Sequence, residues 1–301
     1  MIEIPKNVHL FKPITLWDTP FPSLNEYTQG GFPAGAFVAI MGPPAEGKTT
    51  LEMCLGFRVG SKFKKNVLHI NTEKQGTLTA PMWASRLTEL YTKQKLPIPE
   101  VYLEETVQVH DFFALHGIEL DKRLGNVVQL ELNSVNPLKS KMYDYINNKN
   151  VGIIIYDSLT TPFNTLLIGG RQNQPTRHTG EELFFEITRM LFTGKDLALM
   201  TSNHVSRDVT KPFSTVTDSQ IKGGKSIYHN HDYILYIEAV KSKYAVGYHR
   251  LYVARFPNRP PWQFKLDLML DENGYREITK EELALIKEKT KEEKSVESNG
   301  N

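Results

Sequence analysis

The sequence predicts an α/β fold with a mostly parallel central sheet, helices on both sides and an antiparallel C-terminal extension. Three observations carry this prediction. An apolar run at 36–41 leads directly into a glycine-rich loop and then a predicted helix. A near-continuous apolar run at 151–157 has the composition of a parallel strand covered on both faces. From residue 233 onward, three extended runs follow one another with short, turn-rich connections.

The chain has 301 residues, of which 40% are hydrophobic, enough for one large domain. No apolar stretch approaches the roughly 20 residues that span a bilayer, and residues 1–5 lack the pattern of a signal peptide. We therefore expect a cytoplasmic protein with no membrane partner. The single cysteine, Cys54, excludes a disulfide framework and a zinc cluster. The net charge of +2 predicts that any nucleic-acid surface is local.

We expect three segments along the chain. Residues 1–30 carry several prolines and end in two glycines, which is typical of an extended entry segment. Residues 31–278 form the main domain. Residues 279–301 form a charged helix that decays into a Ser/Asn/Gly tail, with disorder expected beyond about residue 290.

Hydrophobic periodicity predicts the elements of the main domain in order. After the glycine-rich loop we expect a helix at 49–60, a buried strand at 66–71 and a helix at 81–93. An irregular stretch containing two prolines follows, then a short strand at 126–132 and a helix at 139–147. The strand at 151–157, a helix at 181–193 and a strand at 197–201 complete the parallel part. The extended runs are 233–240, 249–256 and 262–268.

Residues 42–50 form a complete G-x-x-x-x-G-K-T element between a predicted strand and a predicted helix, the context in which this motif binds nucleotide phosphates. The loop N–H groups and the positive end of the helix suit phosphate oxygens. Lys48 would neutralise phosphate charge, and the Thr49 hydroxyl would hold Mg2+. The alternative is a chance Gly/Lys loop. The residues of the element are Gly42, Pro43, Pro44, Ala45, Glu46, Gly47, Lys48, Thr49 and Thr50.

Two strand ends supply the carboxylates that hydrolysis of a bound nucleotide needs. Asp157 ends the run at 151–157 and would lie beside Thr49, where it would serve the metal. Its alternative role is to cap the following turn at Ser158. Glu73 follows the predicted strand at 66–71 and would align water against the γ-phosphate. The alternative for Glu73 is a solvated loop carboxylate.

Three further polar residues are weaker candidates. Glu46 competes for the role of aligning water, but phosphate repulsion inside the loop predicts that it points to solvent or to a neighbouring subunit. Asn203 lies just beyond the strand at 197–201 and could sense the γ-phosphate, although Asn after a strand is also common turn chemistry. The adjacent His204 could act in catalysis, and the alternative is a supporting or surface role.

The ordered set of motifs resembles that of RecA-superfamily ATPases, and most closely that of the archaeal RadA recombinases and their paralogues. The motif segments are 42–50, 71–73, 153–160, 201–205 and 223–226, and the resemblance covers about residues 14–278. It implies a RecA-like P-loop ATPase core that takes ATP and Mg2+. It also implies that Glu73 orients the hydrolytic water and that Asp157 serves the metal.

The resemblance further implies two loops that contact single-stranded DNA, at about 163–179 and 206–225. Glycine hinges with cationic tips suit a phosphate backbone. The alternative is that both loops are simply solvated, because Asp208 and Asp218 lower the net positive charge of the second loop. The residues predicted to contact DNA are Arg171, Arg177, Arg207, Lys211, Lys222 and Lys225.

Some features depart from the RadA pattern. We expect no counterpart of the DNA-binding domain that precedes a full RadA core, and therefore a paralogue. His204 stands where a RadA recombinase usually has Gln. The stretch at 255–261 resembles a basic element that KaiC-type proteins and DnaB-type helicases extend to a neighbour's phosphates. Arg255 and Arg259 are therefore candidate arginines acting in trans, with surface ion pairs as the alternative.

The sequence thus predicts an ATPase that binds single-stranded DNA and acts in homologous recombination or DNA repair. Its expected protein partners are further copies of itself or a RadA-type recombinase. One alternative is a hexameric helicase or a KaiC-like signalling ATPase, in which hydrolysis drives motion or signalling. A second alternative is a non-catalytic accessory protein that uses ATP only to stabilise an assembly.

Overall fold

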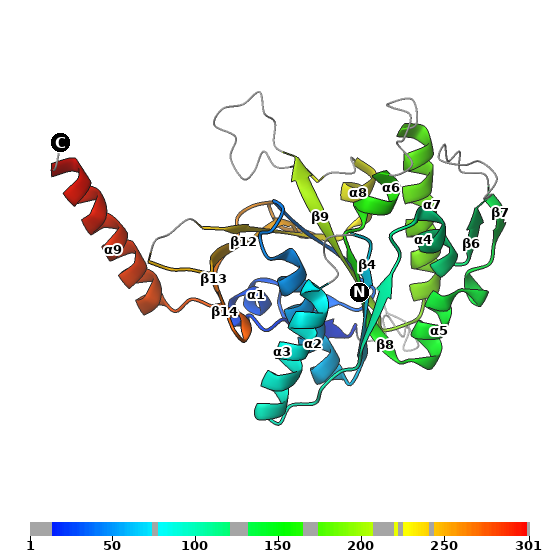
Figure 1. Ribbon diagram of the computed structural model, residues 1–301, viewed down its shortest axis with the longest axis horizontal. Coiled ribbons are helices and arrows are strands. Elements are labelled where there is room, and N and C mark those ends of the chain that lie inside the picture. The colour runs from blue at the N-terminus through cyan, green and yellow to red at the C-terminus, as the bar shows by residue number, and fades with distance from the viewer. Residues whose placement is uncertain are drawn as a thin grey trace, which may run out of the picture.

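The computed structural model describes residues 14–73, 78–120, 132–164, 174–206, 220–221, 225–240 and 244–299. Ten strands within these residues form one sheet, in the order β5, β4, β8, β9, β3, β11, β12, β13, β14, with β10 (Gln220–Ile221) paired to β9. The sheet separates two layers of helices (Figure 1). This mixed α/β architecture confirms the predicted fold class.

The first six strands in that order run parallel to one another. They are β5 (Val101–Glu105), β4 (Asn66–Asn71), β8 (Val151–Asp157), β9 (Ala198–Ser206), β3 (Phe37–Gly42) and β11 (Tyr233–Ala239). Every residue of β3 and β8 is buried, which explains their near-continuous apolar sequences. Because the strands are parallel, their carboxyl ends share one edge of the sheet.

Side-chain alternation along these strands produces two hydrophobic cores, one on each face. On one face, Ile154 and Tyr156 pack with Phe112 and Phe184. This face is covered by α4 (Val109–Leu115), α5 (Lys141–Asn148), α6 (Thr160–Asn164), α7 (Gln174–Phe192) and α8 (Lys225–Asn230). On the other face, Ile153 and Ile155 pack under α2 (Lys48–Phe63) and α3 (Thr79–Lys93).

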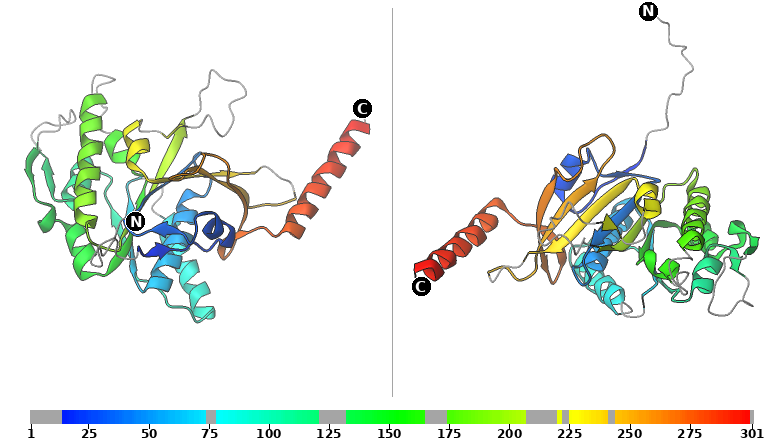
Figure 2. Two further views of the ribbon diagram at one scale, coloured as in Figure 1. Left: turned by 180° about the vertical axis from the view of Figure 1, so that it is seen from behind. Right: turned by 90° about the horizontal axis from the view of Figure 1, so that it is seen from above.

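The antiparallel extension consists of β12 (Tyr248–Arg255), β13 (Lys265–Asp271) and β14 (Gly274–Glu277), which follow β11 in a meander. These strands curl around the α2 side of the sheet, as the two further views show (Figure 2). Leu251, Leu268 and Tyr275 belong to the same core as α2. The extension therefore brings residues near 250 and 270 close to the beginning of α2.

Several elements differ from the sequence prediction. Residues 14–30 are not simply extended: β1 (Leu16–Trp17) pairs with β2 (Phe32–Pro33), and α1 (Pro22–Tyr27) packs into the core. The stretch expected to be irregular contains β5 and α4. The expected strand at 126–132 lies almost wholly outside the described residues, and β7 (Leu132–Val135), which pairs with β6 (Ile118–Leu120), begins at its end. A 3-10 turn, Pro137–Lys139, precedes α5.

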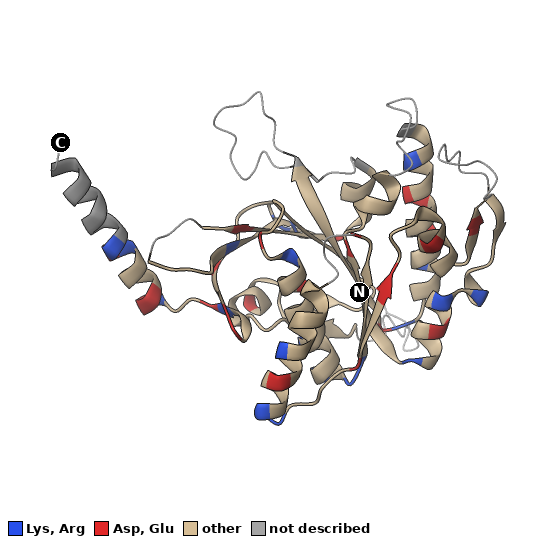
Figure 3. Ribbon diagram, viewed as in Figure 1, with Lys and Arg blue, Asp and Glu red and all other residues tan. Residues whose placement is uncertain are grey.

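At the C-terminus, α9 (Lys280–Asn299) continues beyond residue 290, where disorder was expected. Its start is fixed by reciprocal capping, since Glu282 N donates to Thr279 Oγ1 at 3.1 Å and Thr279 N donates to Glu282 Oε2 at 2.9 Å. Figure 3 shows acidic and basic residues interspersed along α3 and α7 instead of gathered by sign. Across the described residues, no helix has the length and apolar character needed to cross a membrane.

Candidate nucleotide site

The phosphate loop joins β3 to α2 at the carboxyl edge of the sheet, as the motif predicts. Gly47 is the residue before α2 and has a φ of 79°, which is the left-handed region. A Cβ atom on Gly47 would lie 2.0 Å from Tyr275 Oη. Both its backbone conformation and the close approach of β14 therefore require glycine at this position.

Lys48 begins α2 and turns its ammonium back onto the loop. Lys48 Nζ donates to the carbonyl of Pro43 at 2.8 Å and to that of Gly42 at 3.3 Å. Burial lowers the pKa of Lys48, while the nearby carboxylates of Asp157 and Glu52 oppose the shift. The cation is thus held inside the loop, at the position where a phosphate would compensate its charge.

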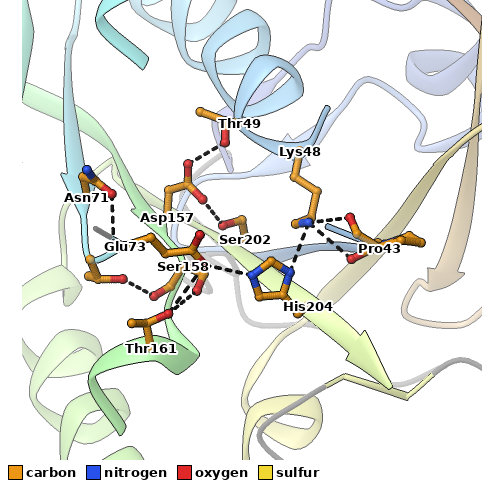
Figure 4. A network of polar contacts seen from close by, with 12 residues as sticks. Pro43, Lys48, Thr49, Asn71, Glu73, Asp157, Ser158, Thr161, Ser202 and His204 are labelled. Atoms are coloured by element: carbon orange, nitrogen blue, oxygen red, sulfur yellow. Dashed lines mark hydrogen bonds and ion pairs between the residues drawn. The ribbon is translucent and has the colours of Figure 1, made fainter. Parts of the chain in front are cut away.

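Thr49 and Asp157 meet directly at the same edge (Figure 4). Thr49 Oγ1 donates to Asp157 Oδ2 at 2.5 Å, and Ser202 Oγ donates to Asp157 Oδ1 at 2.5 Å. His69 Nε2 lies 3.8 Å from Asp157 Oδ2, and burial lowers the pKa of His69. A hydroxyl and a carboxylate are hard oxygen ligands of the kind that Mg2+ takes together with nucleotide phosphates. Thr49 and Asp157 therefore fit the expected metal position.

Among the described residues, no group of three or more His, Cys, Asp or Glu side chains has a geometry that could hold a metal by itself. At a site of two protein oxygen ligands, the remaining ligands of Mg2+ would come from phosphate and water.

Glu73 follows β4 and faces the loop across a short gap. His204 Nε2 lies 2.9 Å from Glu73 Oε1, and His204 Nδ1 lies 3.5 Å from Lys48 Nζ (Figure 4). An ammonium only donates, so this arrangement fits an imidazole that accepts at Nδ1 and carries its hydrogen on Nε2. The backbone N–H of Glu73 donates to Asn71 Oδ1 at 3.0 Å, which fixes the main chain.

The hydrogen bond from His204 lowers the pKa of Glu73 to about 2, against a smaller opposing effect of burial. A hydrogen bond from Ser158 and the charge of Lys48 add to the lowering. Glu73 is therefore a carboxylate at neutral pH. The side chain keeps 28% of its surface exposed, so water reaches it.

Asn203 is placed differently from the expectation that it senses the γ-phosphate. Its side chain is fully buried and donates from Nδ2 to Thr201 Oγ1 at 2.7 Å. Thr201 in turn lies 2.9 Å from His231 Nε2, beside Phe185 in the core beneath α7. Asn203 thus lies on the face of the sheet opposite α2. The neighbours on either side of it in β9, Ser202 and His204, reach the candidate site instead.

Glu46 also differs from its expected position. Its carboxylate accepts a hydrogen bond from the backbone N–H of Ala239, at the end of β11. Glu46 is therefore tied to the adjacent strand within the same chain, although part of its surface remains exposed. This contact ties Glu46 to β11, whereas Glu73 is the carboxylate that contacts His204.

The predicted DNA contacts fall mainly outside the described residues, which include neither Arg171, Arg207, Lys211 nor Lys222. Lys225 begins α8. Arg177 was expected in a loop but lies on α7, which starts seven residues earlier than predicted. Its side chain is 15% exposed, and Nε lies 2.7 Å from Glu181 Oε1. Arg177 is therefore engaged in a largely buried ion pair and not presented at a loop tip.

The two candidate trans-acting arginines make contacts within their own chain. Arg255 Nη1 donates to the carbonyl of Tyr228 at 2.7 Å, and its guanidinium lies over the Tyr228 ring. The guanidinium of Arg259 lies 4.8 Å from the centre of the Tyr27 ring. A role in trans would require either side chain to leave these contacts.

A cavity of about 410 Å3 opens at the loop and is lined by Lys48, Thr49, Glu73, Asp157 and His204, among others. Its size is suited to a nucleotide. A second cavity of about 450 Å3 lies near Gly35, Phe37 and Arg189, and none of the motif residues lines it. The chemistry therefore concentrates in the first cavity.

Sequence reasoning missed Ser202 and His69, which both approach Asp157. Each is a buried polar residue of a parallel strand, and each shares a strand face with residues that pack under α2. That combination is the signal that could have found them, since buried polar side chains need partners.

The first six strands share one carboxyl edge, and this edge carries the phosphate loop, the Thr49 and Asp157 pair and Glu73. The order of these strands, followed by an antiparallel extension beyond β11, is the arrangement expected of a RecA core. The fold is RecA-like.

Comparison with known proteins agrees with the RecA-like fold. The chain is similar to the DNA repair protein RAD51 homolog 4 of Mus musculus, with 26% identity over 193 residues, 63% of this chain and 52% of that protein. The Bos taurus protein of the same name is 27% identical over the same shares. The DNA repair protein RadA of Aquifex aeolicus is 28% identical over 176 residues, 52% of this chain and 38% of that protein.

The RecA-like chain spans about half the length of the mammalian relatives that it matches. No protein-family model matches it. The similarities support a relationship with RecA-superfamily recombinases, and they connect the chain with proteins named for DNA repair.

Proposed function

We propose that the protein binds ATP with Mg2+, hydrolyses ATP and binds single-stranded DNA in recombination or repair. The observation that carries the proposal is the convergence of Lys48, Thr49, Glu73 and Asp157 at one edge of the parallel sheet. Similarity to RAD51 homolog 4 and RadA supports the biological setting.

In this proposal the phosphate loop and the start of α2 bind the triphosphate through backbone N–H groups. Lys48 exchanges the carbonyls of Gly42 and Pro43 for phosphate oxygens. Thr49 and Asp157 hold Mg2+, which supplies positive charge to the phosphates when it is bound. Thr49 would then exchange its hydrogen bond to Asp157 for the metal.

Glu73 accepts a hydrogen bond from water and orients it toward the γ-phosphate. Its low pKa keeps it ionised as an acceptor, and the hydrogen bond from His204 fixes the orientation of one carboxylate oxygen. The position of His204 between Lys48 and Glu73 makes it responsive to an occupied phosphate site. Phosphate binding at Lys48 would thereby alter how Glu73 is held.

Binding of single-stranded DNA is proposed for the segments at 163–179 and 206–225, through Arg171, Arg207, Lys211, Lys222 and Lys225. Arg177 is the weakest member of the original set because it pairs with Glu181. Homo-oligomerisation or association with a RadA-type recombinase is proposed on the same similarity. Arg255 or Arg259 would act on a neighbour's phosphates only after leaving its aromatic contact.

The test combines ATP turnover with DNA binding in the full chain. We expect Mg2+-dependent release of phosphate that Lys48→Ala abolishes, and binding of labelled single-stranded DNA that weakens with rising salt. Reversing the charges of Arg171, Lys211 and Lys222 together should flatten that salt dependence. ATP binding without turnover would instead favour the accessory protein that uses ATP only to stabilise an assembly.

A further inference from the structure

The cavity at the phosphate loop extends past the groups that phosphates and Mg2+ would engage. Thr79 and Trp83 of α3, His249 of β12 and Leu270 of β13 also line it. Neither α3 nor the antiparallel extension belongs to the strand, loop and helix that form the phosphate motif. The fold therefore adds a second wall to the cavity from distant parts of the chain.

The residues of this second wall belong to one corner of the molecule. A Cβ atom on Gly274 would lie 4.0 Å from the Trp83 ring, so the first residue of β14 lies against α3. The backbone N–H of Leu270 donates to the carbonyl of Gly247 at 2.8 Å. These contacts place Trp83, His249 and Leu270 around a common space beside Gly47.

The imidazole of His249 is fixed in orientation. Its Nδ1 lies 2.8 Å from the carbonyl of Gly247, and a carbonyl only accepts, so Nδ1 carries a hydrogen. The ring also meets Tyr275 edge to face, with centroids 5.2 Å apart at an angle of 85°. In the neutral ring, Nε2 is therefore a hydrogen-bond acceptor whose direction is set by the protein.

Nε2 of His249 faces the phosphate loop. It lies 3.6 Å from the position of a Cβ atom on Gly47, and no hydrogen bond engages it within the described part of the chain. Trp83 and Leu270 supply apolar surface on the same wall. An oriented acceptor beside apolar surface suits a heterocyclic ligand that carries an N–H or O–H donor.

We propose that this corner is a nucleoside subsite, in which His249 Nε2 accepts a hydrogen bond from the nucleoside and determines specificity. The inference deepens the proposed function and rests on it, because the phosphate loop must hold the triphosphate end of the same ligand. The donor is either the exocyclic amino group of adenine or a ribose hydroxyl. A guanine base presents a carbonyl where adenine has its amino group, so an acceptor facing that position disfavours it.

The test compares two ligands that differ only by the nucleoside: ATP and inorganic tripolyphosphate. Binding of each is measured by calorimetry with Mg2+ for the wild type, His249→Phe and the exposed control His229→Phe. We expect His249→Phe to bind ATP about 10-fold more weakly, since an interaction of one hydrogen bond is lost. Its affinity for tripolyphosphate, and both affinities of the control, should stay within about 2-fold of the wild type.

The outcomes separate the two proposals. Equal losses for both ligands, or an unchanged affinity for ATP, would overturn the nucleoside subsite while leaving nucleotide binding intact. A wild-type protein that binds neither ligand overturns the proposed function and the subsite together. If His249→Phe fails to fold, Leu270→Trp replaces it in the test, because a larger side chain at this partly exposed position narrows the cavity from the same wall. Leu270→Trp should lower the affinity for ATP and leave the affinity for tripolyphosphate unchanged.

Two analogues then identify the donor. Inosine triphosphate replaces the amino group by a carbonyl, and 2′,3′-dideoxy-ATP removes both ribose hydroxyls. One analogue should bind the wild type more weakly than ATP does. In His249→Phe, that analogue and ATP should bind with the same affinity. If both analogues bind the wild type as tightly as ATP, the acceptor role of His249 is wrong.

Discussion

His204 Nε2 lies 2.9 Å from Glu73 Oε1, so the carboxylate proposed to orient water is itself oriented by a histidine that also contacts Lys48. Lys48 comes from α2, His204 from β9 and Glu73 from the segment that follows β4, three parts of the chain that meet only when it is folded. This path connects the cation that would bind phosphate with the group that would hold water.

The first prediction concerns Glu73→Gln. The amide keeps the size of the side chain but is a poorer acceptor for water, so ATP turnover should fall by about 100-fold or more. ATP affinity should change by less than about 3-fold, because Lys48 and the loop still hold the phosphates. Phosphate release and equilibrium binding measure the two effects. Full turnover in this variant would remove Glu73 from the mechanism.

The second prediction follows from the lowered pKa of Glu73. Its pKa is about 2 in the folded protein against an ordinary value of 4.5, so its ionised form stabilises the fold above about pH 4.5. That contribution is lost as the pH falls from 4.5 toward 2. Urea unfolding across this range should show wild-type stability falling more steeply than that of Glu73→Gln.

His204→Ala is the matched variant for that experiment. Removing the main hydrogen bond should raise the pKa of Glu73 toward 4.5 and shrink its share of the pH dependence. A wild-type profile that is superimposable on both variants would contradict the assigned cause of the shift.

The third prediction concerns the metal. Asp157→Ala removes the carboxylate that accepts from Thr49 and Ser202, and with it one of the two proposed ligands of Mg2+. In the wild type, chelation of Mg2+ should weaken ATP binding by at least about 10-fold. The variant should bind ATP weakly with or without Mg2+. A variant that still responds to Mg2+ as the wild type does would show that Asp157 is not a ligand.

The fourth prediction compares two glycines that share a left-handed backbone. Gly47 has a φ of 79° and Gly194 a φ of 72°, but only Gly47 has a neighbour within contact distance of a Cβ atom, Tyr275 Oη at 2.0 Å. Gly194→Ala should cost about 1 kcal/mol of unfolding free energy, from backbone strain alone. Gly47→Ala should cost more and abolish ATP binding.

Adding Tyr275→Phe to Gly47→Ala removes the oxygen nearest the new methyl group and should recover part of the stability. Chemical denaturation measures all three variants. Equal costs at the two glycines would mean that the contact with Tyr275 does not constrain the loop.

The sequence predicted the central site because its residues are either adjacent in a motif or placed at strand ends. Lys48 and Thr49 follow from the loop, and Asp157 and Glu73 from strand ends at a shared edge. The sequence could not predict in this way which of Asn203 and His204 faces the nucleotide site. Consecutive strand residues face opposite sides of the sheet, and only the packing of α2 decides which side holds the nucleotide.

Other features depend on tertiary context in a similar way. β5 is a short edge strand with exposed residues, next to two prolines, so its apolar pattern is weak. His249 and Leu270 reach the cavity only because the antiparallel extension curls back over α2. The early start of α7 had a readable signal, since Pro175 suits the first turn of a helix.

The last prediction concerns Arg177, which the structure places in an ion pair with Glu181. Burial raises the pKa of Glu181 to about 7 despite the opposing charge of Arg177. A folded-state pKa above the ordinary 4.5 means that the folded protein binds the extra proton, so stability from this group falls as the pH rises from 4.5 to 7. Glu181→Gln should remove this fall.

Arg177→Gln removes the positive charge that stabilises ionised Glu181, so the unfolding free energy that this variant loses should depend on pH. At pH 5 Glu181 is protonated in both proteins, so the variant should lose little unfolding free energy. At pH 8 the loss should reach about 1.4 kcal/mol at most, because without the cation beside it Glu181 stays protonated one pH unit above its wild-type pKa. The exposed pair of Arg276 and Glu282 is the control, and Arg276→Gln should show little difference between the two pH values. Denaturation at both pH values makes the comparison. An Arg177→Gln protein that keeps its stability at pH 8 and loses affinity for single-stranded DNA would return Arg177 to the DNA-binding surface.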